Sequence, residues 1–184
     1  SAHQENLKVI IDPKSVDFRD YRGADVLTPN LAELKKATGI IEESLEAIEA
    51  AARQILKTCR INQILVTLSA RGMLLISEED AHHIPALPCE VFDVSGAGDT
   101  VIALLAAGLL IGLDKVEAAE IANIGASLVV AKSGTACLVP GEILAQSNGN
   151  RNVLPLDEVK KSVSEWRQAG QKIGFTNGCF DLLH

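Results

Sequence analysis

The chain has 184 residues, of which 47% are hydrophobic, and a formal net charge of −7. This composition is typical of a folded globular protein. The acidic balance and the 3% of aromatic residues argue against nucleic-acid binding, which uses cations for phosphates and rings for bases. The four cysteines form no CxxC pair, so we expect buried, reduced thiols. No signal peptide or membrane-spanning run is recognisable, which predicts a cytoplasmic protein without membrane contact.

Short apolar runs alternate with helical patterns along the first part of the chain. Residues 8–11 form a mainly apolar run that ends at Asp12, which predicts a parallel strand with its carboxyl end at that aspartate. Residues 25–27 predict a second short strand. A helix should follow, capped by Asn30 and ended by Gly39. Ligands gather at the carboxyl ends of parallel strands, so Asp12 is a candidate binding residue.

The next segment continues this alternation and adds a hairpin. A second helix should begin near Ser44, because apolar residues recur there at helical spacing. Its expected apolar face consists of Leu45, Ile48, Ala52, Ile55 and Leu56. Residues 64–68 predict a strand and residues 69–72 a turn, after which residues 73–76 and 82–85 pair as a hairpin. This alternation favours a layered α/β fold.

Two further helices precede a change of character in the chain. Residues 99–111 are apolar almost all round, which predicts a buried helix, and Asp114 should start another helix that packs closely against it. The polar, glycine-containing residues 146–155 predict a linker. Residues 156–169 then predict an amphipathic helix, and residues 172–176 predict a strand.

The run from Asp93 to Thr100 carries the strongest functional signal. Gly96 and Gly98 let the backbone approach an anion, and free N–H groups in the first turn of the following helix point at it. Asp99 stands in that turn, where it could accept a proton. By itself, such a turn can be merely the start of a buried helix. The full run Asp-Val-Ser-Gly-Ala-Gly-Asp-Thr, however, resembles the signature of the ribokinase-like sugar kinases, the PfkB family.

This resemblance implies a ribokinase-like three-layer α/β/α fold and the phosphorylation of a small-molecule sugar phosphate with ATP and Mg²⁺. It implies that Asp99 is the catalytic base, which accepts the proton of the attacking hydroxyl, and that Gly96, Ala97 and Gly98 form the anion hole. No direct protein ligand of the metal is implied, and a monovalent cation beside Asp93 is left open. Lid strands often mediate association in this family, so we expect a homo-oligomer.

Two other segments match motifs associated with phosphate in the same family. Its NxxE motif, which is associated with the Mg²⁺ and phosphate environment, falls on Asn30, Leu31, Ala32 and Glu33. The same residues also form a capping box, and a capped helix can serve both purposes. Asp12 and Lys14 match a family pattern at the end of the first strand. Lys14 either steadies phosphate charge or is simply solvated.

Two segments match positions of the family that surround the nucleotide. The stretch from Thr67 to Gly72 resembles the TLGxxG loop, which lines the nucleotide, with Ser69 where the family usually has glycine. A plain turn between two strands is the alternative interpretation. Asn123 resembles a polar position near the adenine in relatives, although an asparagine within a helix has many other uses.

The end of the chain supplies a second resemblance. Residues 175–184, with the sequence FTNGCFDLLH, are similar to the opening of a cytidylyltransferase-like nucleotidyltransferase, in which His184 would be the first histidine of the HxGH motif. We therefore expect the C-terminal, nucleotide-binding part of a kinase domain over residues 1–145, a linker over residues 146–155 and the start of a nucleotidyltransferase domain over residues 156–184.

Together, the two resemblances imply the family of bifunctional enzymes that make ADP-heptose for the lipopolysaccharide core. Its kinase phosphorylates D-glycero-β-D-manno-heptose 7-phosphate at O1, and its second domain transfers an adenylyl group to heptose 1-phosphate. Ribokinase-like domains are longer on the N-terminal side, so we expect this chain to lack the N-terminal half with the lid and to turn over little substrate alone. Two alternatives stay open: a PfkB-family kinase of another sugar such as ribose or fructose, and a non-catalytic nucleotide-binding or interaction module.

Overall fold

A five-stranded mixed sheet lies at the centre of the computed structural model, which describes residues 7–132, 138–149, 156–168, 170 and 172–174. Its strands, in spatial order, are β1 (Ile10–Ile11), β2 (Val26–Leu27), β3 (Gln63–Thr67), β4 (Met73–Ile76) and β5 (Ala81–Ile84). β1, β2 and β3 are parallel because helical segments connect them, whereas β3, β4 and β5 are antiparallel. The predicted hairpin is confirmed, with Leu75 opposite His82.

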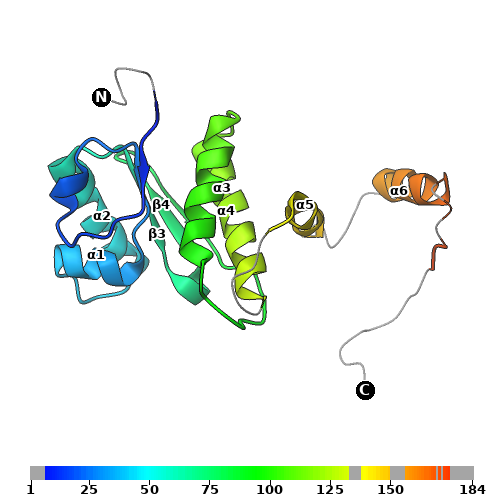
Figure 1. Cartoon of the computed structure of the whole chain (residues 1–184), viewed down its shortest axis with the longest axis horizontal. Helices are drawn as coiled ribbons and strands as arrows, with labels where there is room; N and C mark the ends of the chain where they lie inside the picture. The colour runs from blue at the N-terminus through cyan, green and yellow to red at the C-terminus, as the bar shows by residue number, and fades with distance from the viewer. Residues whose placement is uncertain (1–6, 133–137, 150–155, 169, 171, 175–184) are drawn as a thin grey trace. The chain divides into compact units, whose positions relative to one another are not determined.

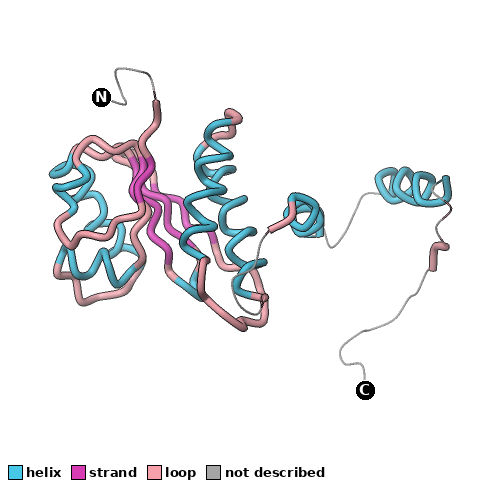
Figure 2. The backbone as a smooth tube through the Cα atoms, viewed as in Figure 1, coloured by secondary structure: helices cyan, strands magenta, loops and turns pink. Residues whose placement is uncertain are grey.

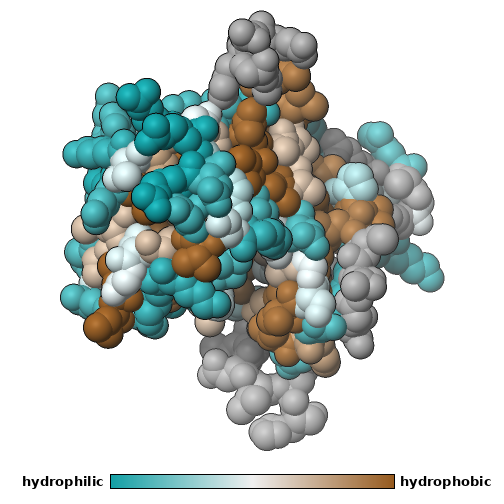
Figure 3. All heavy atoms as spheres, turned by 60° about the vertical axis from the view of Figure 1, so that its left-hand side comes forward, coloured by the Kyte–Doolittle hydropathy of each residue, from teal (hydrophilic) through white to brown (hydrophobic). Residues whose placement is uncertain are grey.

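Helices cover both faces of this sheet (Figure 1, Figure 2). α1 (Leu31–Thr38) and α2 (Leu45–Cys59) lie on one face, and α3 (Ala97–Leu110) and α4 (Lys115–Val130) lie on the other. Alternate strand side chains divide between two cores. Ile64 and Val66 pack with residues of α2, whereas Leu65 packs with residues of α3 and α4. The surface on the α1 and α2 side is mainly hydrophilic (Figure 3), as expected of helices that bury one face. The predicted α/β/α arrangement is confirmed.

Side-chain caps determine where the helices begin. Asn30 Oδ1 accepts the N–H of Glu33 at 2.9 Å, and Glu33 Oε2 accepts the N–H of Asn30 at 2.8 Å. This capping box, together with Gly39 at a φ of 76°, confirms the predicted bounds of α1. Ser44 and Asp114 cap α2 and α4, as predicted.

α3 packs closely against α4 on one side only. A Cβ atom on Gly108 would lie 2.9 Å from Cβ of Ala118, so the two helices approach each other at small residues. Leu105 is buried, but Leu110 and Ile111 are 87% and 75% exposed. The prediction of a helix buried all round is therefore wrong. An apolar composition does not indicate which side of a helix is covered, and here α4 and the sheet cover one side.

The C-terminal elements agree only in part with the sequence predictions. The chain divides into two compact units, residues 1–147 and 148–184. α5 (Pro140–Gly149) extends over residues 146–149, where a linker was predicted, because proline is well suited to the first turn of a helix that then continues. α6 (Leu156–Gln168) confirms the predicted amphipathic helix. Residues 172–174 are not in a strand, since no strand in the described part of the chain pairs with them.

The rest of the predicted linker and of the last predicted strand lies outside the described residues. None of the helices that the structure describes is long and apolar enough to cross a membrane.

The cysteines differ in their environments. Cys59 is buried, as predicted, and burial raises the pKa of its thiol. Cys89 is exposed, so the prediction of a buried thiol is wrong at this position. It follows β5 in a segment without regular structure, which the apolar sequence around it did not indicate. Cys137 and Cys179 lie outside the described residues.

Candidate active site

The glycine turn before α3 leaves backbone donors free. Gly96 has a φ of 79°, a left-handed conformation that glycine adopts without strain. The N–H of Ala97 donates to the carbonyl oxygen of Val94 at 3.3 Å, whereas the N–H groups of Gly98 and Asp99 have no hydrogen-bond partner among the described residues. Free N–H groups at the positive end of a helix dipole attract anions. The N–H groups of Gly96, Gly98 and Asp99 are therefore available to an anion here, whereas that of Ala97 is already bonded.

This turn borders a cleft with a volume of about 170 Å³. The other sides of the cleft come from the carboxyl ends of the parallel strands and from the start of α1, where ligands of α/β proteins bind. The lining consists of Asp12, Lys14, Thr28, Asn30, Glu33, Thr67, Gly96, Gly98, Asp99 and Val101. The structure thus brings together candidate residues from segments that are far apart in the sequence.

Charged side chains gather around the cleft. Lys14 Nζ lies 2.7 Å from Asp12 Oδ2, and this hydrogen bond, with smaller contributions from Glu33 and Asp99, raises the pKa of Lys14. Glu33 Oε2 is held by the capping box. The exposed carboxylate of Asp99 has no hydrogen-bond or ion-pair partner within the described part of the chain. Asp99 is therefore free to accept a proton in the cleft.

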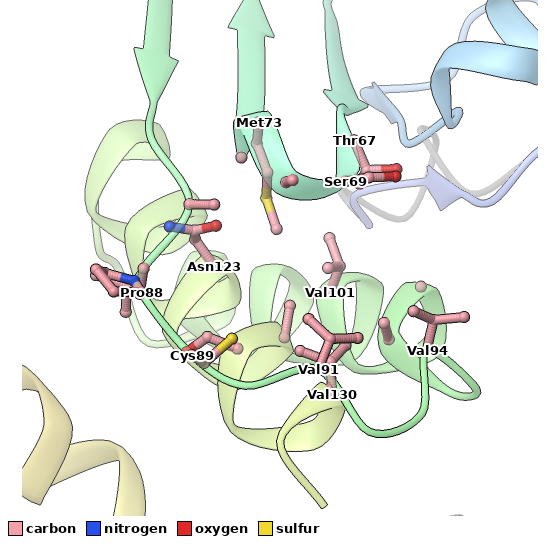
Figure 4. A pocket seen from close by; sticks show the side chains of 18 residues that line it. Thr67, Ser69, Met73, Pro88, Cys89, Val91, Val94, Val101, Asn123 and Val130 are labelled. Atoms are coloured by element: carbon pink, nitrogen blue, oxygen red, sulfur yellow. The ribbon is translucent and has the colours of Figure 1, made fainter.

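A larger cavity of about 660 Å³ adjoins the cleft. Thr67, Gly98 and Val101 line both spaces, so the cleft and the cavity meet at the glycine turn. Figure 4 shows mainly apolar side chains around the cavity. Asn123 is only 7% exposed, and its Nδ2 donates to the carbonyl oxygen of Pro85 at 2.9 Å, which leaves Oδ1 directed toward the cavity (Figure 4). An apolar cavity with few polar groups suits a flat organic ring.

The loop between β3 and β4 forms one wall of this cavity. Ser69 has a φ of 54°, which explains why glycine is usual at this position of the family's loop. Gly72 has a φ of 85°, and a Cβ atom there would lie 2.0 Å from the carbonyl oxygen of Ile84 and 2.5 Å from the nitrogen of Ala86. Gly72 therefore lets the loop lie directly against the segment that leaves β5. Both residues line the cavity.

Sequence reasoning missed two parts of the site. The segment after β5 lines the larger cavity with Ala86, Leu87, Pro88, Cys89 and Val91. Thr28 lines the cleft, where its buried hydroxyl donates to the carbonyl oxygen of Ile11 at 3.3 Å. No pattern in the sequence indicated that the first segment lies against this cavity.

Some predicted site residues lie elsewhere. Leu31 and Ala32 line neither space. Asp93 Oδ1 accepts the N–H of Ser95 at 2.8 Å and so shapes the approach to the glycine turn without lining the cavities. His184 lies outside the described residues.

The oxygen donors of the cleft suit a hydrated divalent cation rather than a closed metal cage. Within the described ranges, no three His, Cys, Asp or Glu side chains are grouped closely enough to hold a metal ion. Mg²⁺ usually keeps several waters and is bound by one or two carboxylates together with substrate phosphates. Asp12 and Glu33, which line the cleft, fit this mode of binding.

The family model described as pfkB family carbohydrate kinase matches residues 1–140. The chain belongs to the PfkB family of carbohydrate kinases. Among the curated relatives of this PfkB chain, Bifunctional protein HldE of Paramagnetospirillum magneticum is 47% identical over 100% of the chain and 39% of the relative. Bifunctional protein HldE of Rhodospirillum rubrum is 43% identical over 98% of the chain and 38% of the relative. This chain thus spans well under half the length of these relatives. Their name, bifunctional protein, agrees with the resemblance of the chain to bifunctional kinases.

Solved structures of similar proteins share the PfkB fold. Ribokinase from Thermotoga maritima has a TM-score of 0.71 and 25% identity, over 80% of this chain and 51% of its own. Arabidopsis thaliana ribokinase, complexed with ribose and ATP, has a TM-score of 0.70 and 27% identity, over 78% of this chain and 48% of its own. Phosphofructokinase-2 from Escherichia coli, with a TM-score of 0.72 and 16% identity over 80% of this chain and 49% of its own, shows the fold alone.

Proposed function

We propose that this chain is part of an ATP-dependent kinase that phosphorylates D-glycero-β-D-manno-heptose 7-phosphate at O1, within a bifunctional enzyme of ADP-heptose biosynthesis. The observation that carries the proposal is the free carboxylate of Asp99 beside the unpaired N–H groups of Gly98 and Asp99, where the cleft meets the larger cavity. Heptose is favoured over ribose because the HldE relatives are 43–47% identical over 98–100% of the chain, which includes residues after 140. The two ribokinases are 25–27% identical to the chain and match only 78–80% of its length.

In the proposed reaction the larger cavity holds the base and ribose of ATP, and the cleft holds the transferring phosphoryl group. The oxygen of the sugar hydroxyl bonds to the γ-phosphorus of ATP, and Asp99 accepts the proton that this hydroxyl loses. The bond between the γ-phosphorus and the oxygen that bridges to the β-phosphate breaks, and ADP leaves. The N–H groups of Gly98 and Asp99 and the ammonium of Lys14 stabilise the negative charge of the phosphoryl group in transit. Mg²⁺, when bound beside Asp12 and Glu33, neutralises phosphate charge.

We also propose that residues 156–184 begin a nucleotidyltransferase domain, with His184 as the first histidine of its phosphate-binding motif. The support is the sequence motif itself and the match of the whole chain to relatives named bifunctional. A monovalent cation beside Asp93 and a homo-oligomeric enzyme are expectations that follow from the same family resemblance, and a cytoplasmic location is an expectation from the sequence.

Replacing Asp99 by asparagine tests the proposed kinase. In the full-length protein that contains this chain, we expect D99N to keep its affinity for ATP but to lower the single-turnover rate of phosphoryl transfer to heptose 7-phosphate by about 10² to 10⁴. Ribose and fructose 6-phosphate, as alternative acceptors, should react more slowly with the unmodified full-length protein. D114N is the matched control, because Asp114 also lies at the start of a helix, asparagine caps equally well, and the residue is outside both cavities. An unchanged rate in D99N would favour a non-catalytic nucleotide-binding module.

A further inference from the structure

A tyrosine outside both cavities holds the backbone of the loop that carries Lys14. Tyr21 Oη accepts the N–H of Lys14 at 2.8 Å and the N–H of Ser15 at 2.6 Å. Two consecutive backbone donors therefore converge on one side-chain atom, directly after β1 ends at the cleft. Hydrogen bonds of this length are well formed, and two of them restrict the path of the loop strongly.

The phenol oxygen that receives these bonds is itself attached to the core. Tyr21 closes a short 3-10 helix, η2 (Phe18–Tyr21), which Asp17 caps by accepting the N–H of Arg19. Phe18, in the same turn, is 2% exposed, and the centroids of the Phe18 and Tyr21 rings lie 6.3 Å apart. Because one end of this turn is buried, Tyr21 offers the loop a rigid point of attachment.

Lys14 needs such an attachment in order to act on the cleft. Its side chain is 77% exposed, and its ion pair with Asp12 is of the surface kind that restrains a long side chain only weakly. The position of the ammonium group therefore depends on where the backbone of residue 14 is held. That backbone is bound to Tyr21 and to no other side chain that the structure describes.

We propose that Tyr21 is a positioning residue for phosphoryl transfer, which holds the backbone of Lys14 so that the ammonium group faces the γ-phosphate in the cleft. The inference rests on the proposed function, because it assumes that Lys14 neutralises the phosphate charge of a nucleoside triphosphate bound in the cleft. Tyr21 touches neither the nucleotide cavity nor the cleft, so its effect passes through Lys14.

The test compares Tyr21→Phe, which keeps the ring and removes the acceptor, with Ser15→Ala as a matched control. Ser15 Oγ makes bonds in the same loop, to the N–H of Asp17 at 3.1 Å and to Asp20 Oδ2 at 2.7 Å, but holds neither backbone donor that Tyr21 binds. Titration calorimetry with Mg²⁺ measures the affinity for ATP with a non-hydrolysable β,γ-imido bond and for ADP. The same titrations are made with Lys14→Gln and with the double variant.

We expect Tyr21→Phe to weaken binding of the triphosphate by about five-fold, the equivalent of one partly screened charge pair, and to leave ADP binding unchanged. Ser15→Ala should change neither affinity. In the Lys14→Gln background, Tyr21→Phe should cause no further loss, because the group that it positions is gone.

Three results would overturn the inference while leaving the proposed function intact: triphosphate binding that Tyr21→Phe does not weaken, an equal loss for ADP, or the same loss with Lys14 replaced. If Tyr21→Phe only destabilised the fold, it would weaken the binding of the triphosphate and of ADP equally, which is the second of these results. If the unmodified chain binds neither nucleotide, the proposed function fails, and the inference that rests on it fails too.

Discussion

Replacing Gly72 by alanine tests how closely the loop after β3 must lie against the segment after β5. The added Cβ would meet the carbonyl oxygen of Ile84 at 2.0 Å and the nitrogen of Ala86 at 2.5 Å, and both are backbone atoms that cannot rotate away. Gly72 also has φ 85° and ψ −130°, a conformation that residues with a Cβ rarely adopt. The alanine variant must therefore move the loop away from β5.

The cost of this movement follows from the bonds that close the loop. Gly72 donates its N–H to the carbonyl oxygen of Ser69 at 3.0 Å, and its own carbonyl oxygen accepts the N–H of Leu68 at 2.7 Å. Strain at a sparsely populated φ and ψ costs about 1–3 kcal/mol, and each turn hydrogen bond contributes about 1 kcal/mol, so we expect a loss of about 3–5 kcal/mol. Nucleotide affinity should fall as well, because the loop lines the larger cavity.

Urea unfolding of the chain measures the free energy of unfolding, with Gly39→Ala as the matched control. Gly39 also has a positive φ, of 76°, but a Cβ atom there would meet nothing within 4 Å. Gly39→Ala should therefore cost only the strain of a left-handed residue, about 1–2 kcal/mol. If Gly72→Ala is no more destabilising than Gly39→Ala, the close approach of the two backbones contributes nothing, and the reasoning is refuted.

Three further predictions concern local stability. Ser69 and Arg60 have φ values of 54° and 53°, which are strained for residues with a Cβ atom. Ser69→Gly and Arg60→Gly should therefore each raise the free energy of unfolding in urea by about 1 kcal/mol. A loss of stability in Ser69→Gly would contradict this. Asn30→Ala should cost about 1 kcal/mol in the same assay by removing the capping box, and an unchanged value would show that water replaces the cap. The hydrogen bond from Arg19 lowers the pKa of Asp17 to about 2, below its usual 3.8, so the stabilisation exists above about pH 4 and is lost as the pH falls toward 2. Asp17→Asn should thus be less stable than the unmodified chain at pH 7, and this difference should shrink steadily as the pH falls from about 4 through 2. A pH-independent difference would contradict this.

Much of the fold could be predicted because the deciding interactions are local. The capping box of Asn30 and Glu33 and the left-handed Gly39 involve residues within one helix, and both were predicted. The exposure of Leu110 and Ile111 was not predicted, because the buried share of a helix surface depends on which elements pack against it. Residues 172–174 failed as a strand for a related reason, because a strand requires a hydrogen-bonded neighbour.

The sequence by itself determined the local chemistry of the site: the glycine turn with Asp99, the capped helix at Asn30 and the lysine after β1. Their meeting in one cleft was decided by the tertiary structure, because the order of parallel strands places the ends of β1, β2 and β3 at the same edge of the sheet. The wall formed by residues 86–91 and the bonds from Tyr21 to the loop of Lys14 were likewise decided by packing. Backbone dihedrals and caps act over a few residues, whereas these contacts join segments whose proximity no local pattern specifies.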